Sequence, residues 1–377
     1  MHFAFLARLL GPAYAGYGVQ TLLLGLLRAI AELDTEHELT LFVGSDQQVP
    51  EELRGAFRIA PLAPAPNAAA ARLWWDHVAV GMLCRQLGVD ALYCPAHVRP
   101  LYAPCPTVVL VLDMMYHRFP EQWPWSEQAY MRLAVAWLTS RATRIPALSE
   151  ATRRDLLALT TTPPERVEVI YPGVPLGFHP MNATAVRMRY DLPQPYILSV
   201  GSDHPRKNLI GTLRAFEQVA PAVTHDLVLV GPTVWPNAAL EARIAASPCF
   251  SRIRRLGLVS EADLIALYSG AELFVFPSLY EGFGFPVLEA LACGCPTITS
   301  NVSSLSEVAG DAALLIPPGD TAALAATMQR ALGDTSLRTE LRRRGIERAK
   351  SFSWHVAAQQ TLELLRCAGQ SQQRGTP

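Results

Sequence analysis

Residues 274–296, FVFPSLYEGFGFPVLEALACGCP, contain in order the three parts of a strand–loop–helix unit. The apolar run before Pro277 is typical of a buried strand. Pro286 suits the first turn of a helix, where its missing N–H is not needed, and Gly294 is a good residue to end that helix. The stretch therefore predicts an α/β unit whose loop lies at the carboxyl end of a strand.

The same alternation extends along the whole chain, because short apolar runs separate longer segments of helical period, as around the expected helix at 19–33. Strands are predicted at 2–7, 39–43, 90–94, 107–112, 145–148, 167–170, 196–200, 227–230, 273–276, 297–299 and 314–316. A segment rich in Pro and Gly, 171–195, is the expected linker. The prediction is an α/β fold of two doubly wound, Rossmann-like domains that face each other across a cleft.

The expected domains are residues 1–185 on the acceptor side, residues 186–350 for the nucleotide sugar, and a last helix within 351–377 that ends in a frayed tail. Half of the 377 residues are hydrophobic and 17% are charged, which excludes a disordered chain. The net charge of -1 provides no global field for nucleic acid.

The cysteines and the N-terminal residues indicate in which cellular compartment the protein is expected. Seven cysteines without a Cys-x-x-Cys pair indicate reduced thiols and no metal site. Arg8 and Gly11 interrupt the first apolar run, which favours a buried strand over a signal peptide. No apolar run is long enough to span a membrane. We therefore expect a cytoplasmic protein whose membrane contact is at most peripheral.

The loop in 274–296 contains residues that suit a phosphorylated ligand. Glycines at 282 and 284 let a ligand approach the backbone, and the start of the following helix favours an anion. Glu289 falls in the first helical turn, where a carboxylate can accept two ribose hydroxyl hydrogens, and Glu281 faces the sugar end. Arg206 and Lys207 follow another predicted strand, where their charges can clamp a diphosphate.

The spacing of Glu281 and Glu289 resembles the Glu-x-x-x-x-x-x-x-Glu motif of retaining glycosyltransferase family 4, whose members have the GT-B fold. Residues 196–208, YILSVGSDHPRKN, are similar to that family's strand followed by an Arg-Lys-Asn turn. The resemblance implies four catalytic residues: Glu281, Asp113, Lys207 and Arg206. It implies a donor site formed by Gly18, Gly201, Arg206, Lys207, Gly231, Leu258, Gly282, Phe283, Gly284, Phe285 and Glu289.

The same resemblance implies the reaction. A hexose, mannose or glucose, would pass from a GDP- or UDP-linked donor to a hydroxyl of a glycan or lipid-linked acceptor with retention of the anomeric configuration. The nucleotide sugar is a co-substrate, and neither a metal nor another cofactor is expected. The last helix would cross back to the first domain. A sugar transfer of this kind is part of polysaccharide biosynthesis.

Two departures limit the match. Leu112 stands where the family usually has a histidine before Asp113, and His117 replaces it only if the loop folds back. Gly16-Tyr-Gly18 lacks the third glycine of a dinucleotide fingerprint, which argues against a nicotinamide-dependent oxidoreductase. A nucleotide-sugar epimerase and an inactive nucleotide-binding scaffold remain as alternatives on the same fold.

Overall fold

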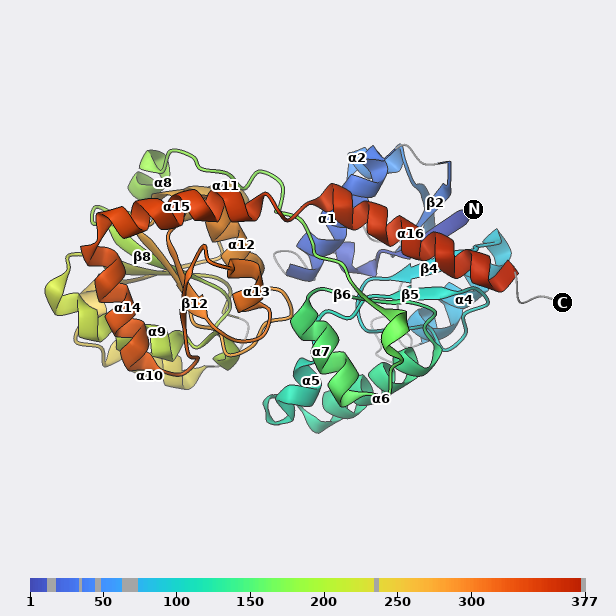
Figure 1. Ribbon diagram of the computed structural model, residues 1–377, viewed down its shortest axis with the longest axis horizontal. Coiled ribbons are helices and arrows are strands. Elements are labelled where there is room, and N and C mark those ends of the chain that lie inside the picture. Colours follow the sequence, from blue (N-terminus) through green and yellow to red (C-terminus); the bar gives the residue numbers. More distant parts are fainter. Residues whose placement is uncertain (12–17, 34–35, 45–48, 63–73, 234–236, 374–377) are drawn as a thin grey trace. The chain divides into compact units, whose positions relative to one another are not determined.

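The computed structural model describes residues 1–11, 18–33, 36–44, 49–62, 74–233 and 237–373. The chain forms two compact units (Figure 1). Met1–Gly173 and Ser353–Pro377 make the first unit, and Val174–Phe352 makes the second. Each unit is built on a parallel sheet with helices, so the predicted pair of Rossmann-like domains is confirmed.

The sheet of the first unit has the strand order β3-β2-β1-β4-β5, which is the order of a doubly wound fold. Its strands are β1 (His2–Leu6), β2 (Glu38–Gly44), β3 (Arg58–Leu62), β4 (Ala91–Cys94) and β5 (Thr107–Val109), and a further parallel pair is β6 (Ile145–Ala147) and β7 (Val167–Val169). Isolated parallel bridges join Val108 to Arg144 and Val111 to Ala147. Through these bridges the sheet continues from β5 toward β6 and β7.

The sheet of the second unit repeats this order with one more strand, as β10-β9-β8-β11-β12-β13. Its strands are β8 (Tyr196–Val200), β9 (Asp226–Val230), β10 (Ile253–Gly257), β11 (Leu273–Phe276), β12 (Thr297–Ser300) and β13 (Leu314–Ile316). The sequence did not predict β3 or β10. Both are edge strands, and they contain charged residues or proline, such as Arg58, Pro61 and Arg254, in place of a continuous apolar run.

Helices flank both sheets. Those of the first unit are α1 (Gly18–Glu32), α2 (Glu51–Arg54), α4 (Val80–Leu87), α5 (Met115–Arg118), α6 (Trp125–Arg141), α7 (Glu150–Leu159) and α16 (Trp354–Gln373). Those of the second are α8 (Thr184–Arg189), α9 (Leu209–Val219), α10 (Ala238–Ala245), α11 (Glu261–Gly270), α12 (Phe285–Ala292), α13 (Leu305–Ala309), α14 (Thr321–Gly333) and α15 (Thr335–Ala349). Among the described residues, no helix combines the length and the apolar character needed to cross a bilayer.

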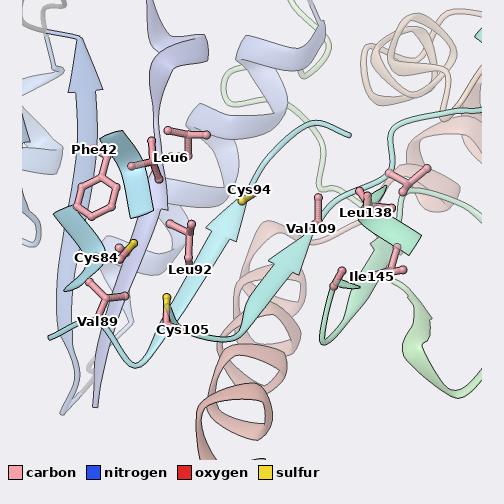
Figure 2. Close-up of a cluster of buried hydrophobic side chains, with 14 of the residues drawn as sticks. Leu6, Phe42, Cys84, Val89, Leu92, Cys94, Cys105, Val109, Leu138 and Ile145 are labelled. Carbon is pink, nitrogen blue, oxygen red and sulfur yellow. The ribbon is translucent and has the colours of Figure 1, made fainter. Parts of the chain in front are cut away.

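Each unit has its own apolar core. In the first, Leu6, Phe42, Leu92 and Val109 extend from four neighbouring strands into one cluster (Figure 2). The thiols in this cluster, such as Cys94, are fully buried, and burial raises the pKa of Cys94 well above its ordinary value. They pack as small apolar groups. In the second unit α9 and α14 lie against each other over the sheet and supply the largest share of the helical core residues.

The first unit ends at Gly173 and not near residue 185, because the segment that follows packs on the second unit. The backbone N–H of Met181 donates to Ser269 Oγ at 3.1 Å, and the Phe178 ring lies 6.2 Å from that of Tyr268. These contacts bind the start of the expected linker to α11. At the other end of the chain, α16 stays helical to Gln373, whereas the sequence predicted a frayed tail after Cys367.

Trp354 begins α16 and fixes this helix to the first unit. α16 packs along α1 and over β4 and β5 (Figure 1). A Cβ placed on Gly25 of α1 would overlap the Trp354 indole, and a Cβ on Gly173 would overlap its backbone N. The two glycines therefore form the notch that receives Trp354.

We expect Gly25→Ala to destabilise the first unit, although alanine is the better helix former by about 1 kcal/mol. The added methyl has to displace the indole, and overpacking of this kind costs about 1–3 kcal/mol. Thermal unfolding followed by circular dichroism measures the loss. Gly333→Ala, in a helix where a Cβ meets nothing within 4 Å, is the matched control and should not lower the midpoint. A Gly25→Ala variant as stable as the control contradicts the prediction.

Candidate functional site

The candidate site lies at the carboxyl ends of β8 and β11, which are neighbours in the middle of the second sheet. The chain goes on from β8 to β9 on one side and from β11 to β12 on the other, so the strand order reverses between them. Open α/β sheets bind ligands at such a switch point. The loop after β8 contains Arg206 and Lys207, and the loop after β11 contains Glu281.

Glu281 joins the two loops through ion pairs. Its Oε1 lies 2.7 Å from Lys207 Nζ, and its Oε2 lies 2.5 Å from an Arg206 guanidinium nitrogen. All three side chains are largely buried. Ser278 Oγ also donates to Oε1 at 2.7 Å. Three residues that the sequence marked as catalytic are therefore in direct contact, and together they have a net charge of +1.

Hydrogen bonds to backbone carbonyls hold the loop after β8 and the loop after β11 together. The N–H of Leu279 donates to the carbonyl of Arg206 at 2.9 Å, and the Asn208 side-chain amide donates to the carbonyl of Pro277 at 3.2 Å. Asn208 is in the left-handed conformation and caps α9, with its Oδ1 accepting from Gly211 N–H. The turn that contains Arg206 and Lys207 is therefore bonded both to the loop after β11 and to the start of α9.

Burial and the ion pairs set the charge of this cluster. Burial opposes ionisation of Glu281, but Arg206 and Lys207 outweigh it and lower the pKa of the carboxyl to about 2. Burial lowers the pKa of Lys207 to about 8, and Glu281 limits that fall. The ammonium also lies 5.0 Å from the centre of the Phe276 ring. Glu281 is therefore always ionised at neutral pH, whereas Lys207 is close to its titration range.

A glycine turn leads from Glu281 into α12. Gly284 has φ +105° and is the N-cap of the helix, and Pro286 occupies its first turn, as the sequence predicted. The Phe283 side chain is buried against Phe285 and Phe352. Phe283 can therefore offer a ligand its backbone but not its ring. The backbones of Gly282 and Gly284 remain the predicted approach to the helix start.

Glu289 is a partly exposed residue in the second turn of α12, and not in the first turn as the sequence predicted, because the helix already begins at Phe285. Its Oε2 accepts a hydrogen bond from the hydroxyl of Tyr268 at 3.0 Å. Burial raises the pKa of this carboxyl to about 7, against the effect of the Tyr268 hydrogen bond. Tyr268 belongs to α11, and nothing in the sequence pattern indicated this contact.

Glycines form the strand ends beside the cluster. Gly201 and Gly231 have φ +153° and +145°, and a Cβ on Gly231 would overlap the carbonyl oxygen of Gly201. The Gly201 backbone faces the stem of Lys207, because a Cβ there would lie 3.5 Å from that side chain. Leu258, just after β10, is 66% exposed. Of these three predicted donor residues, Gly201 and Gly231 can offer a ligand only their backbone, whereas Leu258 presents an exposed side chain.

The remaining predicted residues, Gly18 and Asp113, belong to the first unit. Gly18 starts α1 and is exposed, while Gly16 and Tyr17 lie outside the described residues. Asp113 follows β5, and its Oδ1 accepts from the N–H of Met115 at 2.9 Å. The prediction that Asp113 takes part in catalysis rests on the resemblance alone.

His97 is a neighbour of Asp113 that the sequence patterns did not mark as a functional residue. Its Nε2 lies 2.7 Å from the carbonyl oxygen of Asp113 and 3.3 Å from the Asp113 N. The shorter contact requires a proton on Nε2, so His97 donates to the carbonyl. His97 is buried, and its own N–H donates to Leu110. Its position directly after the predicted strand 90–94 was the available signal.

In the part of the chain that the structure describes, no three His, Cys, Asp or Glu side chains gather in a group that could hold a metal ion.

Comparison with known proteins assigns both units to sequence families. The family described as Glycosyl transferases group 1 matches residues 194–334. The family described as Glycosyltransferase Family 4 matches residues 17–178. Between them the two matches include the Arg206–Lys207 turn, Glu281, Glu289 and Asp113.

Two curated relatives and one solved structure show how far the similarity extends. O-antigen chain mannosyltransferase B of Escherichia coli is 35% identical over 257 residues, 66% of this chain and 67% of that one. The serotype-specific mannosyltransferase WbdA of E. coli is 33% identical over 232 residues, which cover 59% of this chain but 28% of WbdA. Anabaena Alr3699/HepE, solved in complex with UDP-glucose, superposes with a TM-score of 0.78 at 18% identity, over 97% of this chain and 100% of that one. The last match shows the fold alone.

The geometry predicts opposite effects of two substitutions on anion binding. Glu281→Gln should bind inorganic pyrophosphate about tenfold more tightly, or ~1.4 kcal/mol, because the two cations lose their internal anion. Lys207→Ala should bind it more weakly. Isothermal titration calorimetry at low salt measures both, and Glu340→Gln, an exposed glutamate also paired with two arginines, is the control. Weaker binding by Glu281→Gln contradicts this view of the cluster.

Proposed function

The chain belongs to the group 1 glycosyl transferases and to glycosyltransferase family 4, and we propose that it moves a hexose from a nucleoside-diphosphate sugar to a hydroxyl of a glycan or lipid-linked acceptor. The cluster of Arg206, Lys207 and Glu281 at the switch point carries the proposal. Its two cations match a diphosphate, and its carboxylate matches sugar hydroxyls. A nucleotide sugar combines both groups.

Mannose is the donor sugar that we favour, because both E. coli relatives are named as mannosyltransferases. Glucose is the alternative, since the Anabaena protein of the same fold was solved with UDP-glucose. The nucleotide is GDP or UDP. The name of the first relative, which acts on the O-antigen chain, supports a bacterial polysaccharide as acceptor.

In the proposed reaction the bond between the anomeric carbon and the diphosphate oxygen breaks, and the acceptor oxygen attacks from the same face. Because the acceptor attacks the face from which the diphosphate leaves, the anomeric configuration is retained, and the acceptor proton passes to the leaving phosphate oxygen. Arg206, Lys207 and the start of α12 stabilise the negative charge that builds up on the diphosphate. These groups supply the electrostatic stabilisation without a metal. Glu281 binds the sugar, and Asp113 is assigned to the sugar side by the family pattern alone.

A donor screen tests the proposal against its two alternatives. The protein is incubated with GDP-mannose, UDP-glucose and UDP-galactose, with and without a lipopolysaccharide fraction, and the products are separated by mass spectrometry and chromatography. Sugar transfer or slow donor hydrolysis supports a transferase. An epimer formed without acceptor indicates an epimerase, and tight nucleotide binding without any product indicates an inactive scaffold. Either of the last two results overturns the proposal.

Substitutions at the cluster should abolish transfer but leave the fold intact. Glu281→Gln and Lys207→Ala should each lower kcat by about 10²-fold or more, because each removes a charge that acts on the reacting groups. Circular dichroism checks that both variants fold. Lys350→Ala removes an exposed lysine paired with Glu347 and should keep full activity. Normal turnover by Glu281→Gln or Lys207→Ala would falsify the assignment.

The two shifted pKa values predict a narrow optimum of kcat/KM. Glu289 needs its negative charge to accept ribose hydroxyls, so donor capture should rise as pH passes about 7. Lys207 needs its positive charge to hold the diphosphate, so capture should fall as pH passes about 8. Because kcat/KM reports the free enzyme, the profile should be bell-shaped between these values. Glu289→Gln should lose the acid limb, and a flat wild-type profile from pH 6 to 9 contradicts the prediction.

A further inference from the structure

Tyr268 is a buried hydroxyl that the proposed reaction does not yet use. Its side chain is fully buried in α11, and its ring packs on Phe274 with centroids 5.2 Å apart. The Tyr268 hydroxyl donates a hydrogen bond to Oε2 of Glu289 at 3.0 Å. Tyr268 also remains a donor throughout the physiological range, because burial raises its pKa well above the ordinary value. A rigid ring therefore presents a fixed O–H to one oxygen of the carboxylate.

This contact leaves the two oxygens of Glu289 in different situations. Oε2 accepts from Tyr268, whereas Oε1 accepts no hydrogen bond from a side chain that the structure describes. Glu289 is a partly exposed residue, and its Oε1 is not among the buried side-chain oxygens that lack a hydrogen-bond partner, so this oxygen is accessible to solvent. A carboxylate that rotates freely would have to be ordered each time that a ligand binds, at a cost in side-chain entropy.

We propose that Tyr268 is a positioning residue of the donor site, which fixes Oε2 of Glu289 so that Oε1 is presented to the ribose hydroxyls of the nucleotide. The inference rests on the proposed function, because it assumes that Glu289 binds ribose. It adds a residue that does not touch the substrate but determines the orientation and the charge of one that does.

The charge of Glu289 depends on the same hydrogen bond. Burial is the largest influence and raises the pKa, the Tyr268 hydroxyl lowers it, Glu261 of α11 raises it again, and Lys207 lowers it. Cys293, the C-cap of α12, also lies within the field of this carboxyl. The Tyr268 hydroxyl is the strongest of the groups that favour the ionised form. Without it Glu289 stays protonated to higher pH and loses its ability to accept ribose hydroxyl hydrogens.

The chain contains a matched control for a single-oxygen substitution. Tyr196 is also fully buried in the second unit, and its hydroxyl donates to the carbonyl of Leu267 at 2.7 Å, one residue before Tyr268 in α11. Tyr196→Phe therefore removes a buried hydroxyl bound to the same helix without touching Glu289. Any effect that Tyr268→Phe shares with Tyr196→Phe comes from the stability of α11 and not from the carboxylate.

Two measurements on the full chain test the inference. The first follows the Glu289 carboxyl by carbon NMR in protein labelled at glutamate side-chain carbons, with Glu289→Gln used to assign the signal. Its titration midpoint should move to higher pH in Tyr268→Phe and stay in place in Tyr196→Phe. The second measures the affinity of UDP and GDP by calorimetry between pH 6 and 9. Tyr268→Phe should bind the preferred nucleotide about tenfold more weakly at pH 6.5, where both the charge and the orientation of Glu289 are affected, and the loss should be smaller at pH 8.5, where only the orientation is affected.

The outcomes separate this inference from the proposed function. A midpoint that is the same in Tyr268→Phe and wild type overturns the inference, whatever the protein binds. An equal loss of affinity in both tyrosine variants also overturns it, since that is the result of a purely structural role. If neither nucleotide binds wild type, the proposed function fails and the ribose role of Tyr268 fails with it, while the NMR midpoint still reports on the contact.

Discussion

The buried contact of Glu281 with Arg206 and Lys207 is the interaction on which the second unit's site depends. Charges removed from water need partners, and loss of one partner from such a group costs about 3–5 kcal/mol. Here the partners come from loops after two different strands, so the charges can be satisfied only when β8 and β11 are in register. The anion site can therefore form only after β8 and β11 have paired correctly in the sheet.

The central strands of the sheets could be predicted from the sequence, whereas the edge strands and the boundary between the units could not. β8 and β11 are buried on both faces and read as continuous apolar runs, which is why the strands that position Arg206 and Glu281 were found. The edge strands β3 and β10 were missed because one side of an edge is open to water, where charge and proline are tolerated. The unit boundary was placed too late because apolar contacts, such as that of Phe178 with Tyr268, have no local signature.

The candidate site divides in the same way. Residues that act through their own charge in the loop after a strand, such as Lys207 and Glu281, were visible as motifs. Residues that act through a neighbour were not visible, because their partner lies in another element: Tyr268 contacts Glu289 from another helix, and His97 contacts Asp113 from the loop after β4. A tyrosine in a helix and a histidine in a loop are ordinary until the fold brings them to a carboxylate or its peptide group. Such contacts set the ionisation of Glu289 and the path of the chain at Asp113.

The placement of α16 in the first unit has a consequence for how the protein is made. The ribosome completes residues 1–173 long before it produces Trp354, and at the usual elongation rates of about 5–20 residues per second the interval is on the order of ten to forty seconds. Throughout it, the Gly25 notch and the faces of β4 and β5 that α16 covers stay open. The nascent first unit therefore exposes apolar surface until α16 has been synthesised and can cover it.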